Sequence, residues 1–296
     1  MSRPSPTGAR RPPATAGEAA ARLRRRFAAA GVESPASDAK ALLCWALAWE
    51  RARLHAHPEA PVPEEASARL EEAARRREGR EPLAYILGER EFWSLPFRVG
   101  PGVLIPRPET ELLVERAAAL LGGRGPVRVL DLGAGCGAVA VALARELPGC
   151  RVTATDVSER ALALARENAR LNGVEDRVEF LRADLFEGLP AGERFEAVVS
   201  NPPYVCSAAI GGLMPEVARH EPREALDGGP DGMRLLRAIV QGAPARLWPR
   251  GILLLEMAPE QAPGCAEELR RTGAFGEPLL RRDLAGRERV LEAVKA

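Results

Sequence analysis

The sequence lacks the features that would place the chain in a membrane or an oxidising compartment. No apolar run approaches the roughly 18 to 20 residues that a membrane-spanning helix needs, and the N-terminus lacks the apolar core of a secretory signal. The five cysteines are scattered, with no C-x-x-C pair and no histidine nearby at the spacing of metal ligands. We therefore expect reduced thiols, no metal site, no membrane association and a cytoplasmic location.

The sequence also has no excess of charge. Lys and Arg number 42 against 41 acidic residues, a formal net charge of +1. Nucleic-acid-binding domains are usually strongly basic, so no overall field attracts this chain to nucleic acid. Binding of nucleic acid would need a local patch of positive charge.

Length and composition predict a globular protein with one large or two modest domains. The chain has 296 residues, of which 46% are hydrophobic, which is enough for a substantial core. Residues 1–16 are rich in Pro, Arg, Ser and Thr and predict a disordered lead, with a transit peptide as the minor alternative. In residues 17–80 apolar residues recur at three- and four-residue spacing, which predicts a small helical bundle.

Two features of the predicted bundle concern its surface and core. Trp45 and Trp49 lie one helical turn apart and are expected in the core. Arginines cluster at 24–26 and 75–77. Such clusters are usually a solvated face, but they can also dock an acidic or nucleic-acid partner.

Residues 81–108 are expected to link the bundle to a second domain through a β-hairpin. Aromatic residues make up 4% of the chain, yet four of them fall between 85 and 97, which indicates a hydrophobic joint. Apolar alternation on both sides of Gly100-Pro101-Gly102 predicts that the hairpin turns there. A helix is predicted to begin at Glu109.

Residues 109–296 alternate strands and helices, as an α/β domain with a parallel sheet does. A buried strand from Val127 runs into Gly133-x-Gly135-x-Gly137 and then a helix, and glycines there let the backbone approach a ligand closely. The acid before the loop suits a cationic sulfonium or ammonium group and would repel a pyrophosphate. The candidate cofactor residues at this loop are Asp131, Gly133, Ala134, Gly135, Cys136 and Gly137.

Two later strands also end in carboxylates. The strand from Arg151 ends at Asp156, which can accept both hydroxyls of a ribose. The strand Val178 to Leu181 leads to Asp184, which is placed for an adenine amino group. Each signal is weak alone, but their order along the chain makes them strong together.

The stretch Ser200-Asn201-Pro202-Pro203-Tyr204 follows an apolar run that reads as a buried parallel strand ending at the ligand-binding edge of the sheet. Its prolines have fixed φ and no N–H. The Asn201 side-chain oxygen and the Pro202 carbonyl can each accept a hydrogen from a planar –NH2 group while Tyr204 packs on its face. The motif resembles the signature of methyltransferases that modify amide or exocyclic nitrogens; a proline-stopped strand with a capping Asn is the alternative.

Taken together, these motifs resemble those of the HemK-type glutamine N5-methyltransferases, which modify peptide-chain release factors. The resemblance implies a Rossmann-like α/β domain of seven strands, dependent on S-adenosylmethionine, with strand order 3-2-1-4-5-7-6 and an antiparallel strand 7. It also implies a helical N-terminal domain that helps to hold the release factor. It runs from about residue 18 to the C-terminus and rests on stretches 82–88, 91–97, 104–111, 131–137, 200–204 and 220–233.

The resemblance further implies the site residues. S-adenosylmethionine is the expected cofactor, with Leu185 beside its adenine, and a glutamine in a Gly-Gly-Gln loop is the expected substrate. Ala134, Cys136 and Leu185 depart mildly from the residues frequent in the family, which bears on cofactor affinity. The implied catalytic residues are Asn201, Pro202 and Tyr204, and Asn201 is also expected to contact the cofactor. The implied substrate-binding residues are Asn201, Pro202, Pro203, Tyr204, Arg107 and Glu109.

Three other functions stay open. A related enzyme methylates a glutamine of a ribosomal protein and shares the core motifs. An adenine-N6 nucleic-acid methyltransferase uses the same type of motif to bind the –NH2 group of a flipped base. The near-neutral charge and the lack of a recognisable target-recognition domain make nucleic acid an unlikely substrate. A non-catalytic binding module is disfavoured because every acceptor and glycine of the site is present. We expect a monomeric enzyme with release factors as its protein partners.

Overall fold

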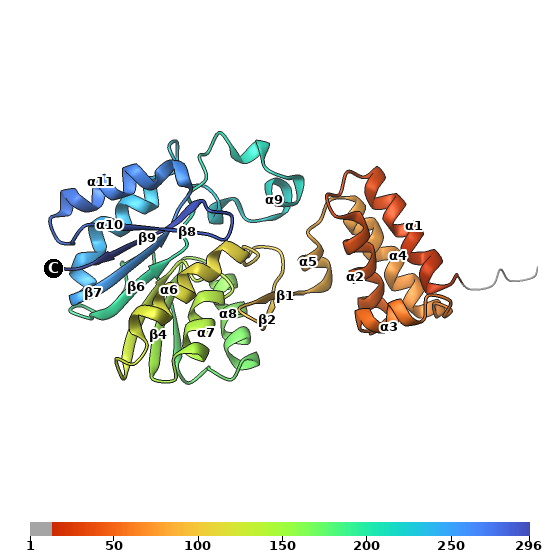
Figure 1. The fold of residues 1–296 in the computed structure, drawn as a ribbon, viewed down its shortest axis with the longest axis horizontal. Coiled ribbons are helices and arrows are strands. Elements are labelled where there is room, and N and C mark those ends of the chain that lie inside the picture. The colour runs from red at the N-terminus through yellow and green to blue at the C-terminus, as the bar shows by residue number, and fades with distance from the viewer. Residues whose placement is uncertain (1–13) are drawn as a thin grey trace, which may run out of the picture. The chain divides into compact units, whose positions relative to one another are not determined.

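The computed structural model describes residues 14–296, and the chain divides into two compact units between Leu87 and Gly88 (Figure 1). We call them the helical unit, residues 14–87, and the sheet unit, residues 88–296. Of the predicted disordered lead, residues 1–16, the first 13 lie outside the described residues. Its last residues are ordered, because Thr15 caps the first helix in a capping box with Glu18.

The helical unit confirms the predicted bundle, and no strand interrupts its described part. Buried Leu23, Phe27, Leu42 and Leu70 form its core. Helices and their bounds are α1 (Ala16–Ala29), α2 (Pro35–Leu47), α3 (Arg51–Ala56), α4 (Glu64–Glu78) and α5 (Leu83–Leu87).

The prediction that Trp45 lies in the core is wrong. The Trp45 side chain is 39% exposed, because Leu42, Leu43 and Ala46 fill the buried face of α2 and leave Trp45 on its rim. Trp49 is half-buried, and the Arg53 guanidinium lies 4.5 Å from the centre of its ring.

The sheet unit begins with a hairpin of β1 (Glu89–Phe92) and β2 (Leu95–Arg98). The predicted turn at Gly100 to Gly102 is wrong, because the chain turns at Trp93 and Ser94, which have φ of 52° and 54°. Such left-handed conformations favour glycine or asparagine. Two contacts hold Trp93 there: its backbone N–H donates to Glu111 over 2.8 Å, and its indole N–H donates to Glu146 over 3.0 Å.

A single sheet of seven strands forms the centre of this unit, in the order β5-β4-β3-β6-β7-β9-β8. Numbered within the sheet, this order is 3-2-1-4-5-7-6. Five adjacent strands, β5, β4, β3, β6 and β7, run parallel to one another. Strand β9 is antiparallel to its two neighbours, β7 and β8, so the predicted topology is confirmed. The strands are β3 (Val127–Leu132), β4 (Cys150–Asp156), β5 (Val178–Arg182), β6 (Phe195–Ser200), β7 (Leu247–Glu256), β8 (Leu279–Arg282) and β9 (Glu288–Val294).

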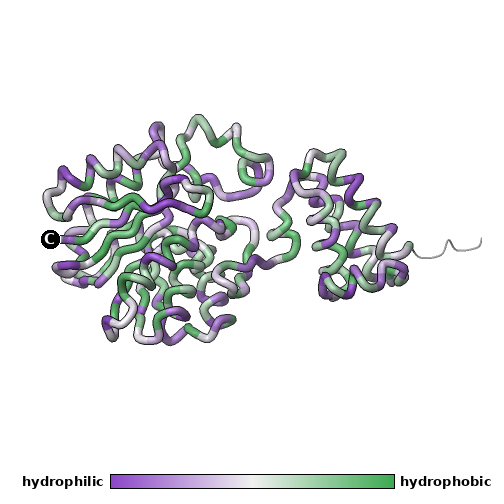
Figure 2. The backbone as a smooth tube through the Cα atoms, in the orientation of Figure 1, coloured by the Kyte–Doolittle hydropathy of each residue, from purple (hydrophilic) through white to green (hydrophobic). Residues whose placement is uncertain are grey.

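Helices cover both faces of the sheet (Figure 1), and the strands between them are predominantly hydrophobic (Figure 2). Helices α6 (Glu111–Leu121), α7 (Ala138–Glu146) and α8 (Glu159–Leu171) pack on one face, and α10 (Arg234–Arg246) and α11 (Ala262–Thr272) on the other. Shorter elements are α9 (Pro215–His220) and the 3-10 helices η1 (Pro108–Thr110), η2 (Ile210–Gly212), η3 (Arg223–Ala225) and η4 (Pro259–Gln261).

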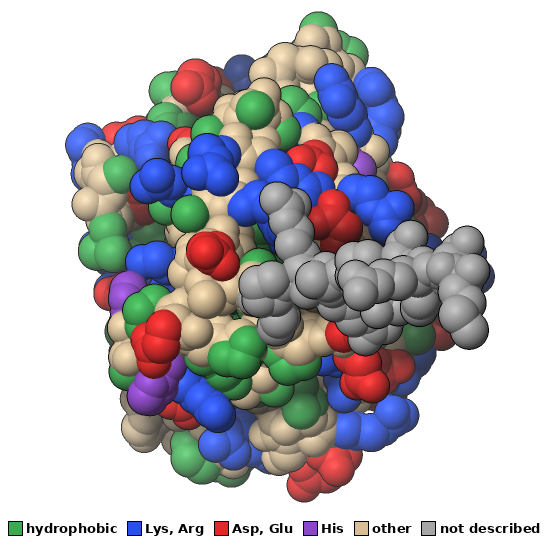
Figure 3. Space-filling view, turned by 90° about the vertical axis from the view of Figure 1, so that its right-hand side faces the viewer, with side chains coloured by type: hydrophobic (Ala, Val, Ile, Leu, Met, Phe, Trp, Pro, Cys, Tyr) green, Lys and Arg blue, Asp and Glu red, His purple; other side chains and the backbone are tan. Residues whose placement is uncertain are grey.

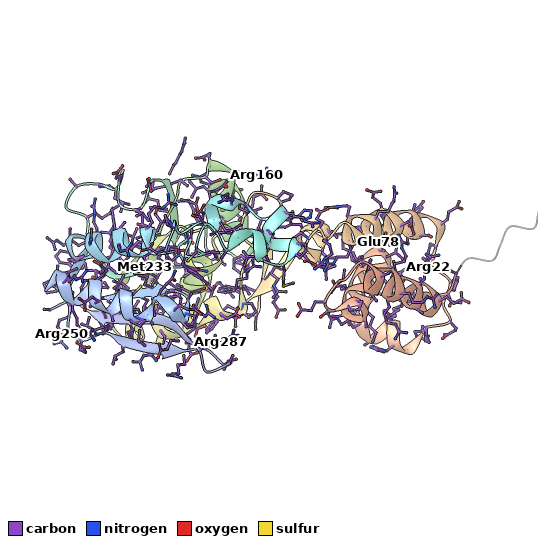
Figure 4. The ribbon with its side chains drawn as sticks, turned by 90° about the horizontal axis from the view of Figure 1, so that it is seen from above. Arg22, Glu78, Arg160, Met233, Arg250 and Arg287 are labelled. Atoms are coloured by element: carbon purple, nitrogen blue, oxygen red, sulfur yellow. The ribbon has the colours of Figure 1, made fainter. Side chains whose placement is uncertain are left out.

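Buried contacts tie the sheet to the loops at its carboxyl edge. Met233, labelled in Figure 4, precedes α10 and packs into the core with Leu236 and Cys265. The Asn168 side chain donates to the carbonyls of Arg98, over 3.0 Å, and Cys136, over 2.9 Å. Asn168 thereby fixes the hairpin against the glycine loop, because both are hydrogen-bonded to one buried side chain.

Two further findings concern the described residues as a whole. None of their helices combines the length and the apolar character needed to cross a membrane. The cysteines are free thiols, and four of them are buried.

Candidate active site

The carboxyl ends of β3, β4, β5 and β6 open into one pocket of about 480 Å³. This is where open parallel sheets bind ligands, and the volume is in the range of small-molecule sites. Gly137, Glu109 and Tyr204 do not line it. The predicted residues that do are Arg107, Asp131, Gly133, Ala134, Gly135, Cys136, Asp156, Asp184, Leu185, Asn201, Pro202 and Pro203.

The three loop glycines serve two different purposes. Gly133 and Gly135 have positive φ, and a Cβ built at either meets no atom within 4 Å, so both border open space that a ligand can enter. Gly137 also has positive φ, but a Cβ there would lie 3.0 Å from the Cβ of Ala165. Gly137 therefore permits close packing of the loop against α8.

Asp131 places a buried carboxyl beside the glycine loop. It is 2% exposed, and its Oδ2 atom has no hydrogen-bond partner among the described residues. Burial raises the pKa of this carboxyl to about 7, with a smaller rise from the charge of Asp156. A cationic group in the pocket would stabilise the ionised form. The site thus fits a ligand that carries a sulfonium or ammonium.

Asp156, at the end of β4, is held by backbone donors. Its Oδ2 accepts the Gly135 N–H over 2.8 Å and its Oδ1 accepts the Ser158 N–H over 2.9 Å. Burial raises the pKa of Asp156, the two N–H groups lower it, and the charge of Glu224 raises it. The carboxylate is therefore fixed in orientation, with lone pairs left for a diol.

The next strand supplies the other end of the pocket. Asp184 is exposed, and Leu185 has φ of 50°, a left-handed conformation that is uncommon outside glycine. Asp184 and Glu187 form an isolated bridge that closes this turn. Both Asp184 and Leu185 line the pocket.

The Asn201-Pro202-Pro203-Tyr204 stretch follows β6 and is held from three elements. The Asn201 Nδ2 group donates to the Thr110 hydroxyl of η1 over 3.0 Å. The Tyr204 hydroxyl donates to Glu256 at the end of β7 over 3.0 Å, and the Tyr204 carbonyl accepts from Gln261 over 2.7 Å. Since Tyr204 is anchored behind the pocket, its packing on a substrate amide stays a prediction.

Arg107 lines the pocket, and its guanidinium is bonded to Glu221 over 2.6 Å. The other oxygen of Glu221 accepts the Ile105 N–H over 3.3 Å, so Glu221 fixes both the loop and its arginine. Glu109, half-buried, lies outside the pocket lining.

The sequence prediction missed four polar residues of this region: Thr110, Glu221, Glu224 and Glu256. Glu256 carried a usable signal, because it ends an apolar strand in the same manner as Asp156. The other three lie within stretches quoted for the family resemblance, but nothing in their spacing distinguishes them. Within residues 14–296, no three or more His, Cys, Asp or Glu side chains are grouped so as to hold a metal ion.

The chain matches the PrmC N-terminal domain over residues 18–88 and the methyltransferase small domain over residues 108–220. The release factor glutamine methyltransferase of Moorella thermoacetica is 43% identical over 271 residues, which cover 92% of this chain and 95% of that protein. The protein of the same name from Cereibacter sphaeroides is 44% identical over 268 residues, covering 90% and 94%. A solved methyltransferase from Pyrococcus furiosus shares the fold, with a TM-score of 0.51 and 19% identity over 68% of this chain and 89% of that one.

Proposed function

The chain belongs to the release factor glutamine methyltransferase family, and we propose that it methylates the glutamine of the Gly-Gly-Gln loop of peptide-chain release factors. The methyl group would pass from the sulfur of S-adenosylmethionine to the side-chain amide nitrogen, N5. The bond between sulfur and the methyl carbon breaks, S-adenosylhomocysteine leaves, and the nitrogen gives up one proton. One observation carries the proposal: Asn201, held by Thr110, and Asp131, whose Oδ2 has no hydrogen-bond partner among the described residues, line the same pocket. An amide acceptor and a site for a cation are thus within one cavity.

Bound S-adenosylmethionine supplies an electrophilic methyl group on a positively charged sulfur. Asp131 would stabilise the positive charge of the cofactor, and Asp156 would accept the ribose hydroxyls. Asp184 and Leu185 would face the adenine. Because the sulfur is already cationic, the transfer needs no metal ion as Lewis acid.

Positioning must account for most of the rate. An amide nitrogen is a poor nucleophile, and the pocket-lining carboxylates are too weakly basic to deprotonate it. The Asn201 oxygen and the Pro202 carbonyl would hold the two amide hydrogens and aim the nitrogen at the methyl group. The same acceptors stabilise the positive charge that develops on the nitrogen.

Asp156→Ala is expected to weaken binding of S-adenosylhomocysteine. Each charge-assisted bond to a ribose hydroxyl is worth roughly 1.5 to 3 kcal/mol before water compensates. Calorimetry measures the dissociation constant directly. Glu179→Ala is the matched control, with unchanged affinity expected, because Glu179 is an exposed carboxylate of the neighbouring strand that does not line the pocket. An Asp156→Ala affinity equal to that of the parent would mean that the ribose is held by other groups.

The helical unit is proposed to supply part of the docking surface for the release factor. Of the six clustered arginines, four are bonded within the unit: Arg26 to Glu71 and Glu78, Arg75 to Glu72, Arg76 to Glu81 and Arg77 to Asp38. Basic and acidic side chains accordingly lie side by side in Figure 3. Arg24 and Arg25 are exposed and make no ion pair with any described residue. Of the six arginines, we therefore propose these two as contacts for the release factor.

Two rival substrates are tested in the same experiment. The full chain is incubated with labelled S-adenosylmethionine and, separately, with a release factor, a ribosomal protein or nucleic acid. We expect label in the release factor alone, and we propose that the enzyme acts as a cytoplasmic monomer. Label in the ribosomal protein or nucleic acid, with the release factor unlabelled, would contradict the assignment.

A further inference from the structure

Three elements meet behind the Asn201 amide. Thr110, at the end of η1, is 4% exposed, and its hydroxyl accepts the Asn201 Nδ2 hydrogen over 3.0 Å. A hydroxyl that accepts with a lone pair still has its own proton to donate. Thr110 also lowers the pKa of the Glu256 carboxyl at the end of β7, so this carboxyl is the neighbouring group toward which the proton can turn.

Glu256 is 1% exposed and has an unused oxygen. Its Oε1 accepts the Tyr204 hydroxyl over 3.0 Å, while Oε2 has no hydrogen-bond partner among the described residues. A buried carboxylate oxygen without a partner is costly. The unbonded Oε2 of Glu256 therefore favours the orientation of the Thr110 hydroxyl in which its proton points toward Glu256.

On the basis of the function proposed above, we propose that Thr110 is a positioning residue for methyl transfer. Its hydroxyl, oriented by the Glu256 carboxylate, accepts the Asn201 N–H and thereby keeps the Asn201 oxygen toward the substrate nitrogen. Thr110 does not touch the reacting atoms in this role. It selects one of the two orientations of the Asn201 amide.

The orientation matters because an amide presents an acceptor on one side and a donor on the other. A flipped Asn201 would direct its –NH2 group at the substrate –NH2, and two donors cannot bond each other. No other described residue accepts from Asn201 Nδ2. Thr110 is therefore the group that distinguishes a productive from an unproductive site.

The arrangement also predicts a pH dependence. The groups that face Glu256 are the Tyr204 and Thr110 hydroxyls, the Arg289 guanidinium and the Glu109 carboxylate. Burial, with a smaller contribution from Glu109, raises the pKa of Glu256 to about 7, against the lowering effect of the other three. Ionised Glu256 is present above this pH, so kcat should fall as the pH is lowered through about 7.

The test compares Thr110→Val with Thr110→Ser in the full chain, using an intact release factor and saturating S-adenosylmethionine. Valine keeps the shape and removes the hydroxyl, whereas serine keeps the hydroxyl. We expect valine to lower kcat by about tenfold or more, the rate equivalent of roughly 1.4 kcal/mol, with the dissociation constant of S-adenosylhomocysteine unchanged. Serine should restore kcat to within a few-fold of the parent.

Equal kcat for Thr110→Val and the parent would overturn the proposal, as would an equal loss in both variants, since packing would then explain it. If the valine variant does not fold, Glu256→Gln decides. A fall in kcat below pH 7 that is smaller than the parent's supports the proposal, since the pKa of the Asp131 carboxyl is also about 7 and Asp131 contributes the remainder. A fall as large as the parent's contradicts it. A parent enzyme that leaves the release factor unmethylated would instead contradict the proposed function, so the two failures are distinguishable.

Discussion

We expect Asn201→Ala to fold, to bind S-adenosylhomocysteine with the affinity of the parent and to lose roughly 10²-fold or more in kcat. Losses of this size follow removal of one preorganised hydrogen-bonding group that acts on developing charge. The alanine removes the acceptor for the substrate amide, while Pro202 and the rest of the loop stay anchored through Tyr204. Single-turnover kinetics under saturating cofactor measures the effect on the chemical step.

Asn201→Asp is the matched comparison. Aspartate keeps acceptor oxygens toward the substrate but cannot donate to Thr110, so its kcat should lie between those of alanine and the parent. An alanine variant that turns over within a few-fold of the parent would remove Asn201 from the reaction.

The second large effect is expected on removal of the helical unit. The sheet unit, residues 88–296, is compact and has its own core, and it contains every residue that lines the pocket. It should keep its affinity for S-adenosylhomocysteine and lose most of kcat/KM for intact release factor. The physical reason is that glycines beside a target glutamine offer no side chains, so binding energy must come from a remote surface.

A short Gly-Gly-Gln peptide supplies the control for this truncation. Its weak methylation should be the same in both proteins, because only remote binding energy was removed. In the full chain, Arg24→Glu with Arg25→Glu should reproduce part of the loss, whereas the same change at ion-paired Arg75 should not. A folded sheet unit that methylates intact release factor as efficiently as the full chain would reduce the helical unit to a stabilising appendage.

The sheet could be predicted from the sequence because its information is local. Each of β3, β4 and β6 is a mostly buried strand that leads to residues with distinctive chemistry: the glycine loop, Asp156 and Asn201. Carboxyl ends of parallel strands share one edge, so these residues had to meet. The structure places all three at one pocket.

The hairpin turn could not be predicted in this way. Gly100-Pro101-Gly102 is rich in turn-forming residues, whereas neither Trp93 nor Ser94 belongs to the residue types that favour the left-handed conformation that both adopt. Their left-handed conformation is sustained by Glu111 and Glu146, which follow 18 and 53 residues later. Local propensity was overridden by contacts that only the folded chain brings together.

Thr110 and Glu256, which hold Asn201 and Tyr204 in place, were missed for the same reason. Thr110 and Asn201 are 91 residues apart, and Tyr204 and Glu256 are 52 apart. Short motifs name the residues that face the substrate, but the residues that orient them are joined only through the sheet. A carboxylate at the end of a strand, as in Glu256, is a signal that can be used in other chains of this fold.

The most direct test of the proposed function is to locate the methyl group on the product. After reaction with the full chain, the release factor is digested and its Gly-Gly-Gln peptide is sequenced by tandem mass spectrometry. We predict one added methyl group on the glutamine side chain, at nitrogen N5, and none on a release factor whose glutamine is replaced by alanine. Methylation at any other residue, or an unmodified glutamine in a reaction that consumes S-adenosylmethionine, would contradict the proposed function.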